Sequence, residues 1–408
     1  MPPASLLNAT CDTETAQPRS KRARADELET HLGQNGRSVK IRWADEDCCT
    51  YHAVWLRANC MCHSCHDASQ QRLYLPHHVP DNLKLLTASV RGDNFEFTTD
   101  DGHTCVHPAS RLQEFSYSES SIVSRITHRR KFMTMPVSRV PVMSYDELME
   151  GERGIWKWMN LLQRHGIVTF TGVPDEAHQV ARIASRIAPV QPTIYGDTWD
   201  VVAKANPENI AYSPLGLVLH MDLLAYESAP GVQLLHCRRF DDGIIGGGSF
   251  FSDSFAAAYR LQEKAPHHFE VLTRVHATFH KHNEDQHMVY RRPHIVIDDR
   301  GELVAVNWSP PFEGPLQAKE EDVEAYYQAY KAFAKEIEDE RHLLRFRMSP
   351  NTCTTFLNRR ILHARDEYKA VGEQQRVLEG CYILQDDFLN RFRKFSSKYA
   401  PDTLWAYY

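Results

Sequence analysis

The sequence has no apolar run of about 18 or more residues, which is the length that a transmembrane helix needs. Its first residues also lack the apolar segment of a secretory signal. The formal net charge is −6, which argues against a general nucleic-acid-binding protein. The ten cysteines show no secreted disulfide framework, and the chain has no internal repeat or low-complexity segment. These absences predict a cytoplasmic protein that binds neither membranes nor nucleic acids.

The N-terminal residues 1–36 are polar and poor in aromatic side chains. Such a segment cannot bury enough surface to offset the entropy of ordering, so we expect a disordered tail. A basic run at residues 20–24 fits a nuclear address, the first alternative to a cytoplasmic location. A mitochondrial location is the second alternative, although early acidic residues disfavour a presequence.

The rest of the chain is expected to form two domains, and its hydrophobic content of 42% is ample for a core. The smaller domain covers residues 37–125. Three segments there alternate apolar and polar side chains, as β-strands do: residues 39–43, 84–90 and 94–98. A basic, loop-like stretch around Arg129 marks the boundary. Residues 126–408 then read as helix, strand, helix and many strands, an α+β layout.

Helices of the larger domain are predicted from caps and apolar periodicity. A capping box at Ser144 and Glu147 opens a helix that should run to about His165. A second helix should start at Pro174 and end near Ile187. Further helices are expected at residues 255–266, 319–340 and 386–392, and strands at residues 274–280 and 288–292.

Three cysteines, Cys60, Cys62 and Cys65, stand within six residues of one another in the smaller domain. Thiols this close indicate a metal site or a redox pair. The alternative is a set of free thiols in a reducing cell. Zinc in a structural site takes four sulfur or nitrogen ligands in a tetrahedron, with no open position. The fourth ligand must come from elsewhere, and the candidates are His103, His107, His63, His66 and Cys105.

His220 and Asp222 follow a short apolar segment and point to the same side of an extended chain. Together with His363 they make a set of two imidazoles and one carboxylate. This set leaves about three positions of an octahedral ion open, as in non-haem Fe(II) oxygenases. Arg376 stands thirteen positions after His363, where its guanidinium can bind a dicarboxylic co-substrate through two hydrogen bonds. These residues indicate iron and 2-oxoglutarate.

The sequence resembles the gamma-butyrobetaine dioxygenases and the related trimethyllysine dioxygenases over residues 39–395. The most specific matching segments are residues 56–65, 195–199, 209–212, 220–237 and 376–382. The resemblance implies a double-stranded β-helix (jelly-roll) oxygenase core with a small N-terminal zinc-binding domain. It implies Fe(II) at His220, Asp222 and His363, and 2-oxoglutarate at Arg376 with Ser249 as a hydroxyl partner. It also implies a homodimer and selects His103 as the fourth zinc ligand.

The resemblance further implies an aromatic cage for a quaternary ammonium group, made by Tyr195, Trp199, Tyr212 and Tyr382, with Asn209 at the polar end of the substrate. A trimethylammonium group donates no ordinary hydrogen bond, so ring faces must recognise it. The implied reaction is hydroxylation of gamma-butyrobetaine to L-carnitine, with O2 as oxidant, ascorbate as reductant and decarboxylation of 2-oxoglutarate to succinate.

Several positions depart from the family pattern. Leu223 and Leu224 follow Asp222 where an aromatic or polar residue is usual, Leu357 interrupts the pattern before His363, and Ser309 stands where an asparagine is expected. The alternative substrate is therefore trimethyllysine or another trimethylammonium or amine metabolite. From a different class, the alternative is an inactive zinc-containing interaction module, which would bind zinc but no Fe(II).

Overall fold

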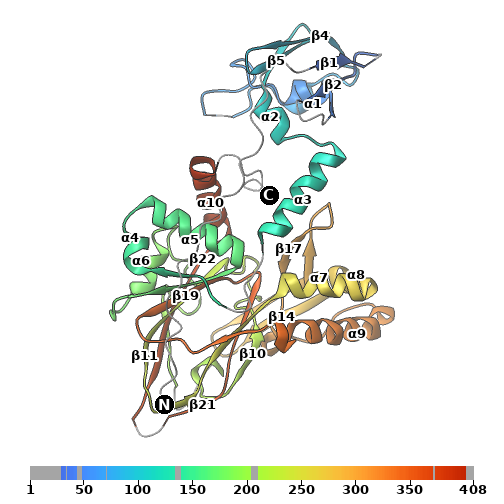
Figure 1. The fold of residues 1–408 in the computed structure, drawn as a ribbon. Coiled ribbons are helices and arrows are strands. Elements are labelled where there is room, and N and C mark those ends of the chain that lie inside the picture. Colours follow the sequence, from blue (N-terminus) through green and yellow to red (C-terminus); the bar gives the residue numbers. More distant parts are fainter. Residues whose placement is uncertain are drawn as a thin grey trace. The chain divides into compact units, whose positions relative to one another are not determined.

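The computed structural model describes residues 29–33, 35–43, 48–69, 71–133, 139–203, 210–370 and 373–400. Asn209 and the basic run at residues 20–24 lie outside these ranges. The chain divides into two compact units between Thr127 and His128, and each is described by itself (Figure 1). Among the described residues, no helix combines the length and the apolar character that a membrane span requires.

The N-terminal unit contains two three-stranded antiparallel sheets. Their strands are β1 (Glu29–Leu32), β2 (Ser38–Arg42) and β3 (Cys48–His52), then β4 (Leu85–Arg91), β5 (Asn94–Thr99) and β6 (Thr104–Pro108). The helices are α1 (Ala53–Ala58), η2 (Pro76–His78), α2 (Ala109–Glu114) and α3 (Glu119–Phe132). Alternate side chains of β2 and β5, such as Ile41 and Phe97, enter one buried core. The three predicted strands are therefore present to within one residue.

Two expectations for this part of the chain are wrong. The segment Glu29–Leu32 is not part of a disordered tail, because β1 pairs with β2 and so satisfies its backbone polar groups. The basic stretch around Arg129 is not a loop, because α3 continues to Phe132. Basic residues are good helix formers and are favoured at the negative end of a helix.

The second unit is built on two β-sheets. The larger sheet has the strand order β7 (Val142–Ser144), β8 (Ile167–Thr171), β19 (Thr352–Leu357), β11 (Val232–Phe240), β22 (Arg376–Ile383), β9 (Trp199–Val201). The smaller sheet has the order β10 (Leu217–His220), β20 (Ile361–Arg365), β13 (Ser249–Asp253), β18 (Leu344–Phe346). Leu235 and Phe356 of the first sheet and Phe251 and Ile361 of the second belong to one buried apolar cluster. The two sheets therefore pack face to face, as in a jelly roll.

Helices cover the outer face of the larger sheet. α5 (Glu152–His165) lies on β8 and β19, and α6 (Gln179–Ala184) lies on β11 and β22 (Figure 1). α10 (Gln385–Tyr399) packs on α5, which follows the short α4 (Tyr145–Met149). These helices therefore cover the outer face of the central strands β8, β19, β11 and β22.

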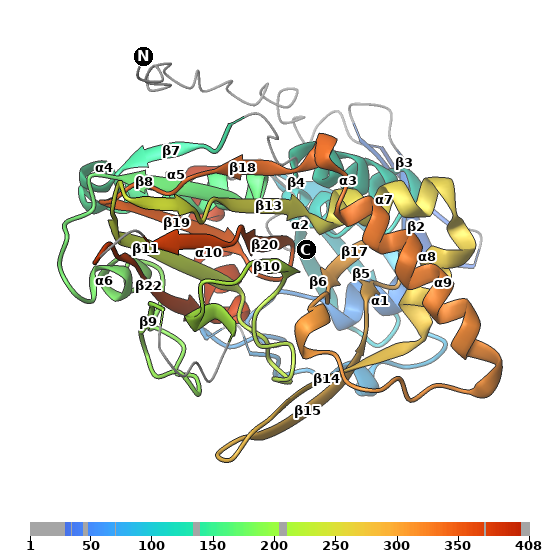
Figure 2. The same cartoon turned by 90° about the horizontal axis from the view of Figure 1, so that it is seen from below.

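A second group of helices packs beside the smaller strands. α7 (Ser254–Lys264), α8 (Pro266–Arg274) and α9 (Glu320–Ile337) lie against one another (Figure 1). The remaining short elements are β12 (Ile244–Gly246) with β21 (Tyr368–Ala370), β16 (Ile295–Ile297) with β17 (Leu303–Val306), and η3 (Ile210–Tyr212), η4 (Pro310–Phe312) and η5 (Glu340–His342). The hairpin of β14 (His276–His282) and β15 (His287–Pro293) extends away from the sheets (Figure 2).

The serine half of the capping box is present, whereas the Glu147 carboxylate accepts a 2.6 Å hydrogen bond from Lys157 Nζ, and the helix that opens here is shorter than predicted. Ser144 Oγ accepts the Glu147 N–H at 3.1 Å. The helix ends at Met149, and α5 begins separately at Glu152. A Cβ atom on Gly154 would stand 2.0 Å from the Glu147 carbonyl oxygen, so glycine at this position lets the two helices pack closely.

Other boundaries also differ from the predictions: α10 runs to Tyr399 instead of residue 392, and α6 ends at Ala184 instead of Ile187. The helix expected from Pro174 begins at Gln179, because His178 adopts a left-handed conformation with φ of 64° just before it. The strand expected from Arg274 begins at His276, because Arg274 is the last residue of the unpredicted helix α8.

Candidate active site and metal centres

His220, Asp222 and His363 lie together at the smaller sheet: the two histidines are on paired strands, and Asp222 is in the loop that follows the first of these strands. His220 ends β10, and antiparallel pairing sets it directly opposite His363 on β20. The two ring centroids are 4.2 Å apart. The Asp222 carboxylate oxygens lie 3.4 Å from His220 Nε2 and 3.8 Å from His363 Nε2. These donor atoms fit one face of an octahedral Fe(II), with about three positions left for other ligands.

Hydrogen bonds to the backbone orient this group. His220 Nδ1 donates to the Val218 carbonyl at 2.8 Å, which leaves Nε2 to bind a metal. Asn358 Oδ1 accepts the Asp222 N–H at 2.9 Å, and Asn358 Nδ2 donates to the Asp222 carbonyl at 3.1 Å. Leu223 then adopts a left-handed conformation with φ of 58°, which is costly for a residue with a side chain. The Asn358 side chain thus fixes the backbone of Asp222 on both its N–H and its carbonyl group.

Two of the three side chains have the protonation state that binds a metal. Burial lowers the pKa of the third, His220, but the hydrogen bond and charge of Asp222 outweigh burial and raise it above its ordinary value. Burial and the charge of His220 lower the pKa of His363 to about 3, so this imidazole is neutral at neutral pH. Burial raises the pKa of Asp222, but the positive charges that His363 and His220 carry at low pH, together with the hydrogen bond from His220, outweigh burial, and the pKa of Asp222 falls well below its usual range. A neutral imidazole and an ionised carboxylate are the forms that bind a cation.

The three residues line a pocket that also contains Arg376, Ser249 and Gln233. Arg376 is 4% exposed, and its Nε–H has no hydrogen-bond partner among the described residues. Burial, together with the nearby charge of Arg365, lowers the pKa of Arg376 to about 10, so it stays charged at neutral pH. A buried guanidinium with an unsatisfied donor fits a ligand carboxylate. The pocket therefore fits 2-oxoglutarate at Arg376, with the Ser249 hydroxyl as a second candidate contact.

Four aromatic side chains, Tyr195, Trp199, Tyr212 and Tyr382, line the same pocket. The Trp199 ring centroid is 6.0 Å from that of Tyr195 and 4.3 Å from that of Tyr382, on which it stacks. Gly380 lies opposite Trp199 in the pairing of β22 with β9, and a Cβ atom there would stand 2.6 Å from the indole ring. Glycine at this position therefore lets the indole lie directly against β22.

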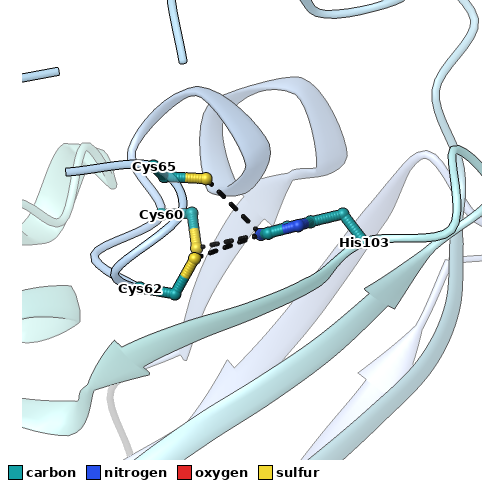
Figure 3. A group of neighbouring side chains, drawn as sticks. All are labelled: Cys60, Cys62, Cys65 and His103. Atoms are coloured by element: carbon teal, nitrogen blue, oxygen red, sulfur yellow. Dashed lines mark hydrogen bonds between the residues drawn. The ribbon is translucent and has the colours of Figure 1, made fainter. Parts of the chain in front are cut away.

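A second group of ligand side chains lies in the N-terminal unit. The three cysteines are on the loop after α1, and His103 points toward them from the turn between β5 and β6 (Figure 3). His103 Nε2 lies 3.4 Å from Cys60 Sγ, 3.6 Å from Cys62 Sγ and 3.5 Å from Cys65 Sγ. Donor atoms of a tetrahedral zinc at its usual bond lengths are about 3.5 Å apart. The four residues therefore fit a structural zinc ion.

Arg57 of α1 connects the cysteine loop to the turn that carries His103. Its guanidinium donates to Cys65 Sγ at 3.3 Å and to the Asp101 carboxylate at 2.8 Å. Asp101 Oδ1 in turn accepts the His103 N–H at 3.2 Å. A positive charge beside a thiolate stabilises the form that binds a metal.

The other candidates for the fourth ligand are engaged elsewhere. His107 and His66 hydrogen-bond the backbone carbonyls of Leu56 and Cys60, and His63 is exposed. Cys105 lies beside Cys60, and its hydrogen bond lowers the pKa of the Cys60 thiol to about 3.

Among the side chains of the pocket that were not predicted from the sequence are those of Arg365 and Lys281. Arg365, two residues after His363 on β20, donates to the carbonyls of Ala211, Ser213 and Leu215 at 3.1, 2.7 and 2.6 Å, and so fixes the segment that carries Tyr212. The sequence could have indicated Arg365, because residues two apart on a strand point to the same face as His363 does. Lys281, on β14, also lines the pocket. No sequence pattern indicated it, because the hairpin meets the pocket only in the folded chain.

The comparisons with known proteins agree with this geometry. Residues 135–382 match the taurine catabolism dioxygenase TauD, TfdA family, and residues 30–113 match the gamma-butyrobetaine hydroxylase-like N-terminal family. The chain is 30% identical to the gamma-butyrobetaine dioxygenase of Pseudomonas sp. (strain AK-1), covering 86% of this chain and 92% of that protein. It is also 30% identical to dioxygenase str8 of Strobilurus tenacellus, over 84% of each chain. The trimethyllysine dioxygenase of Meyerozyma guilliermondii is 25% identical, over 88% of this chain and 93% of that protein.

The family match and these relatives define the class of the protein: it is a dioxygenase that uses Fe(II), 2-oxoglutarate and O2 on a small molecule. Within this class, the chain belongs to the family of the gamma-butyrobetaine and trimethyllysine dioxygenases. The expectation of an inactive interaction module is thereby set aside.

Proposed function

We propose that this enzyme hydroxylates gamma-butyrobetaine to L-carnitine. The observation that carries the proposal is the presence of Tyr195, Trp199, Tyr212 and Tyr382 in the pocket that also contains the candidate iron ligands. Ring faces bind a trimethylammonium group with about 0.5–2 kcal/mol, depending on its desolvation. A group held at this end presents a chosen C–H bond to the metal position, which is how a site selects among similar methylene groups. The relatives named gamma-butyrobetaine dioxygenase support this substrate.

The proposal gives the chain's own residues distinct tasks. His220, Asp222 and His363 hold Fe(II), and Arg376 binds 2-oxoglutarate with the help of the Ser249 hydroxyl. When bound, iron and 2-oxoglutarate activate O2: one oxygen atom enters succinate as CO2 leaves, and the other enters a C–H bond of the substrate. The apolar pocket walls, among them Leu235 and Leu378, exclude water around the reacting groups. Ascorbate is the proposed reductant that keeps iron in the Fe(II) state.

The second candidate substrate is trimethyllysine or another trimethylammonium or amine metabolite. It carries the same cationic group but a different polar end. The relatives named trimethyllysine dioxygenase favour it, and so does Ser309, which departs from the asparagine of the family pattern. Asn209, proposed for the polar end, lies outside the described residues.

The N-terminal unit is proposed to be a zinc-binding domain, with Zn(II) held by Cys60, Cys62, Cys65 and His103, and residues 126–408 to be the catalytic domain. The support is the spacing of the four donor atoms around one point. We also propose a homodimer and a cytoplasmic location. Light scattering of the purified protein and microscopy of a tagged chain test these two statements.

The test of the proposed reaction is succinate release with Fe(II), ascorbate and O2, in the presence of gamma-butyrobetaine or trimethyllysine. Wild type is measured beside Tyr212→Ala, which removes one ring of the cage. The proposal expects strong stimulation by gamma-butyrobetaine and a loss of about tenfold or more in the variant. Stimulation by trimethyllysine alone would favour the second candidate. If neither compound stimulates succinate release by a protein that binds Fe(II) and 2-oxoglutarate, both proposed substrates are refuted.

A further inference from the structure

The side chain of Arg365 holds the segment that carries Tyr212. Its guanidinium donates hydrogen bonds to the backbone carbonyls of Ala211, Ser213 and Leu215, at 3.1, 2.7 and 2.6 Å. Arg365 is buried, and hydrogen bonds from a charged donor are stronger than those between neutral groups. The position of Tyr212 in the pocket therefore depends in part on the position of one charged side chain.

The same guanidinium lies near the group proposed to bind 2-oxoglutarate. Arg365 Cζ is 5.1 Å from the centre of the Tyr368 ring, and Arg376 Cζ is 5.8 Å from the same centre. Ser249, the proposed hydroxyl partner of 2-oxoglutarate, pairs directly with Arg365 across β13 and β20. Both arginines are buried, and neither Nε–H has an acceptor among the described residues. Two like charges therefore share this end of the pocket.

Tyr368 also connects this end of the pocket to the Tyr212 segment. Its ring faces both guanidinium groups, and its backbone N–H donates to the Pro214 carbonyl at 3.0 Å. The segment of residues 211–215 is thus attached to the arginine pair by side-chain and by backbone hydrogen bonds.

A bound carboxylate changes the forces on Arg365. Two buried like charges repel each other more strongly than they would in water, because their surroundings screen them less. A carboxylate of 2-oxoglutarate at Arg376 adds an attraction for Arg365 that opposes this repulsion. A ligand shifts an equilibrium by the difference in its affinity for two states. The co-substrate therefore favours the state in which Arg365 points inward and holds residues 211–215.

We propose that Arg365 is a positioning residue that couples the two sites: 2-oxoglutarate bound at Arg376 fixes the Tyr212 segment and so completes the aromatic cage. This coupling rests on the proposed function, which places 2-oxoglutarate at Arg376 and Tyr212 in the cage. It goes beyond that function because the two ligands must then bind cooperatively. Each ligand raises the affinity for the other by the same factor, as thermodynamic linkage requires.

Hydrogen exchange tests the first step without any substrate. The full chain is loaded with Mn(II), and exchange of the backbone N–H groups in residues 211–215 is followed by mass spectrometry with and without 2-oxoglutarate. The co-substrate should slow this exchange by about tenfold in wild type. In Arg365→Lys the effect should fall below about twofold, because lysine keeps the charge but lacks the planar fork that reaches three carbonyls.

Titration calorimetry tests the second step. Gamma-butyrobetaine is titrated into the chain loaded with Mn(II), with and without 2-oxoglutarate, and 2-oxoglutarate is titrated with and without gamma-butyrobetaine. Each compound should raise the affinity for the other by about tenfold in wild type and by less than about twofold in Arg365→Lys.

Arg347→Gln is the matched control. Arg347 Cζ lies 3.8 Å from the centre of the Phe240 ring, and Arg376 Cζ lies 5.4 Å from the same centre. Arg347 donates to the carbonyls of Ile244 and Asp241, so the variant removes a charge near Arg376 without removing a contact to residues 211–215. It should weaken the binding of 2-oxoglutarate and keep the tenfold coupling.

Three results would overturn the coupling. The first is weaker binding of both ligands to Arg365→Lys with an unchanged coupling factor, since Arg365 would then have only a structural role. The second is an equal loss of coupling in Arg347→Gln, since charge alone would then explain it. The third is unchanged exchange of wild type at saturating 2-oxoglutarate, a result that holds even if Arg365→Lys does not fold.

Failure of the proposed function gives a different pattern. If gamma-butyrobetaine does not bind wild type while 2-oxoglutarate still slows exchange through Arg365, the proposed substrate is wrong and the action of 2-oxoglutarate on the Tyr212 segment is supported. Absence of 2-oxoglutarate binding to wild type would overturn both statements.

Discussion

The Tyr382 hydroxyl donates a 2.7 Å hydrogen bond to Asp222 Oδ2, so one ring of the proposed cage is tied directly to a candidate iron ligand. Asp222 Oδ1 lies on the side of His220 Nε2. Burial and the negative charge of Asp222 raise the pKa of Tyr382 well above its ordinary value, so the hydroxyl keeps its proton. The contact fixes the orientation of the carboxylate and connects the substrate pocket to the metal site.

Tyr382→Phe should weaken Fe(II) binding by about tenfold, because the ring remains but the hydrogen bond that orients Asp222 is lost. The measurement is an anaerobic Fe(II) titration of the metal-free protein. Tyr212→Phe is the matched control, since it removes a hydroxyl from another ring of the same pocket. Equal Fe(II) affinities of wild type and Tyr382→Phe would refute the orienting role.

Gly380→Ala should raise the KM for the trimethylammonium substrate by about tenfold or more and leave the affinity for 2-oxoglutarate nearly unchanged. The added Cβ atom would stand 2.6 Å from the Trp199 ring, so the indole must move away from β22. Initial rates at varied substrate concentration, together with 2-oxoglutarate titrations, separate the two effects. Gly216→Ala, where the nearest atom would be 3.4 Å away, is the control. An unchanged KM would mean that the position of Trp199 does not matter for binding.

Cys65→Ser should release the zinc proposed for the N-terminal unit and lower its thermal midpoint by about 5 °C or more. A serine hydroxyl is a poor zinc ligand, and Arg57 would lose its thiolate partner. Zinc content by elemental analysis and the unfolding curve give the two readouts. Cys48→Ser, outside the group of four ligands, should keep about one zinc per chain. Retention of zinc by Cys65→Ser would contradict the proposed ligand set.

Glu313 should make the stability of the enzyme depend on pH. Burial raises its pKa from 4.5 to about 7, against the hydrogen bonds from Tyr330 and the Ser309 backbone. Because the folded state holds this proton more tightly than the unfolded chain, the stability that it provides is present below about pH 4.5 and is lost as the pH rises through about 7. The loss is on the order of 3 kcal/mol.

Glu313→Gln tests this relationship, since an amide cannot ionise. The variant should have a higher thermal midpoint than wild type at about pH 8, and the difference should nearly vanish at about pH 4, below the ordinary pKa of 4.5. Unfolding curves at the two pH values provide the comparison. A constant difference between the variant and wild type at both pH values would contradict the prediction.

The candidate ligands could be found from the sequence because local rules determine them. His220 and Asp222 are two residues apart, and the three cysteines share one loop, so spacing alone placed their donor atoms together. The fourth ligand of the cysteine group, His103, is distant in sequence and was selected by the family resemblance. Other features depend on pairing between distant segments and could not be predicted locally. The strand β1, for example, is ordered because it pairs with β2.

The residues that sequence reasoning missed act through contacts between distant segments. Lys281 meets Tyr195 across 86 positions of the chain, and Asn358 meets Asp222 across 136. Neither pair leaves a periodic or compositional pattern. The predicted helix from Ser144 to His165 was wrong for a similar reason. The close approach of Gly154 to Glu147 depends on how two separate helices pack, and the apolar periodicity of either helix does not reveal it.

The central claim is that oxidation of 2-oxoglutarate is coupled to hydroxylation of a trimethylammonium substrate at the group formed by His220, Asp222 and His363. The most direct measurement is the parallel quantification of succinate and of the hydroxylated product from gamma-butyrobetaine, by mass spectrometry, for wild type and His363→Ala. The account predicts L-carnitine and succinate in a ratio of about one to one for wild type and neither product for the variant. Succinate without L-carnitine, or L-carnitine formed equally by His363→Ala, would contradict it.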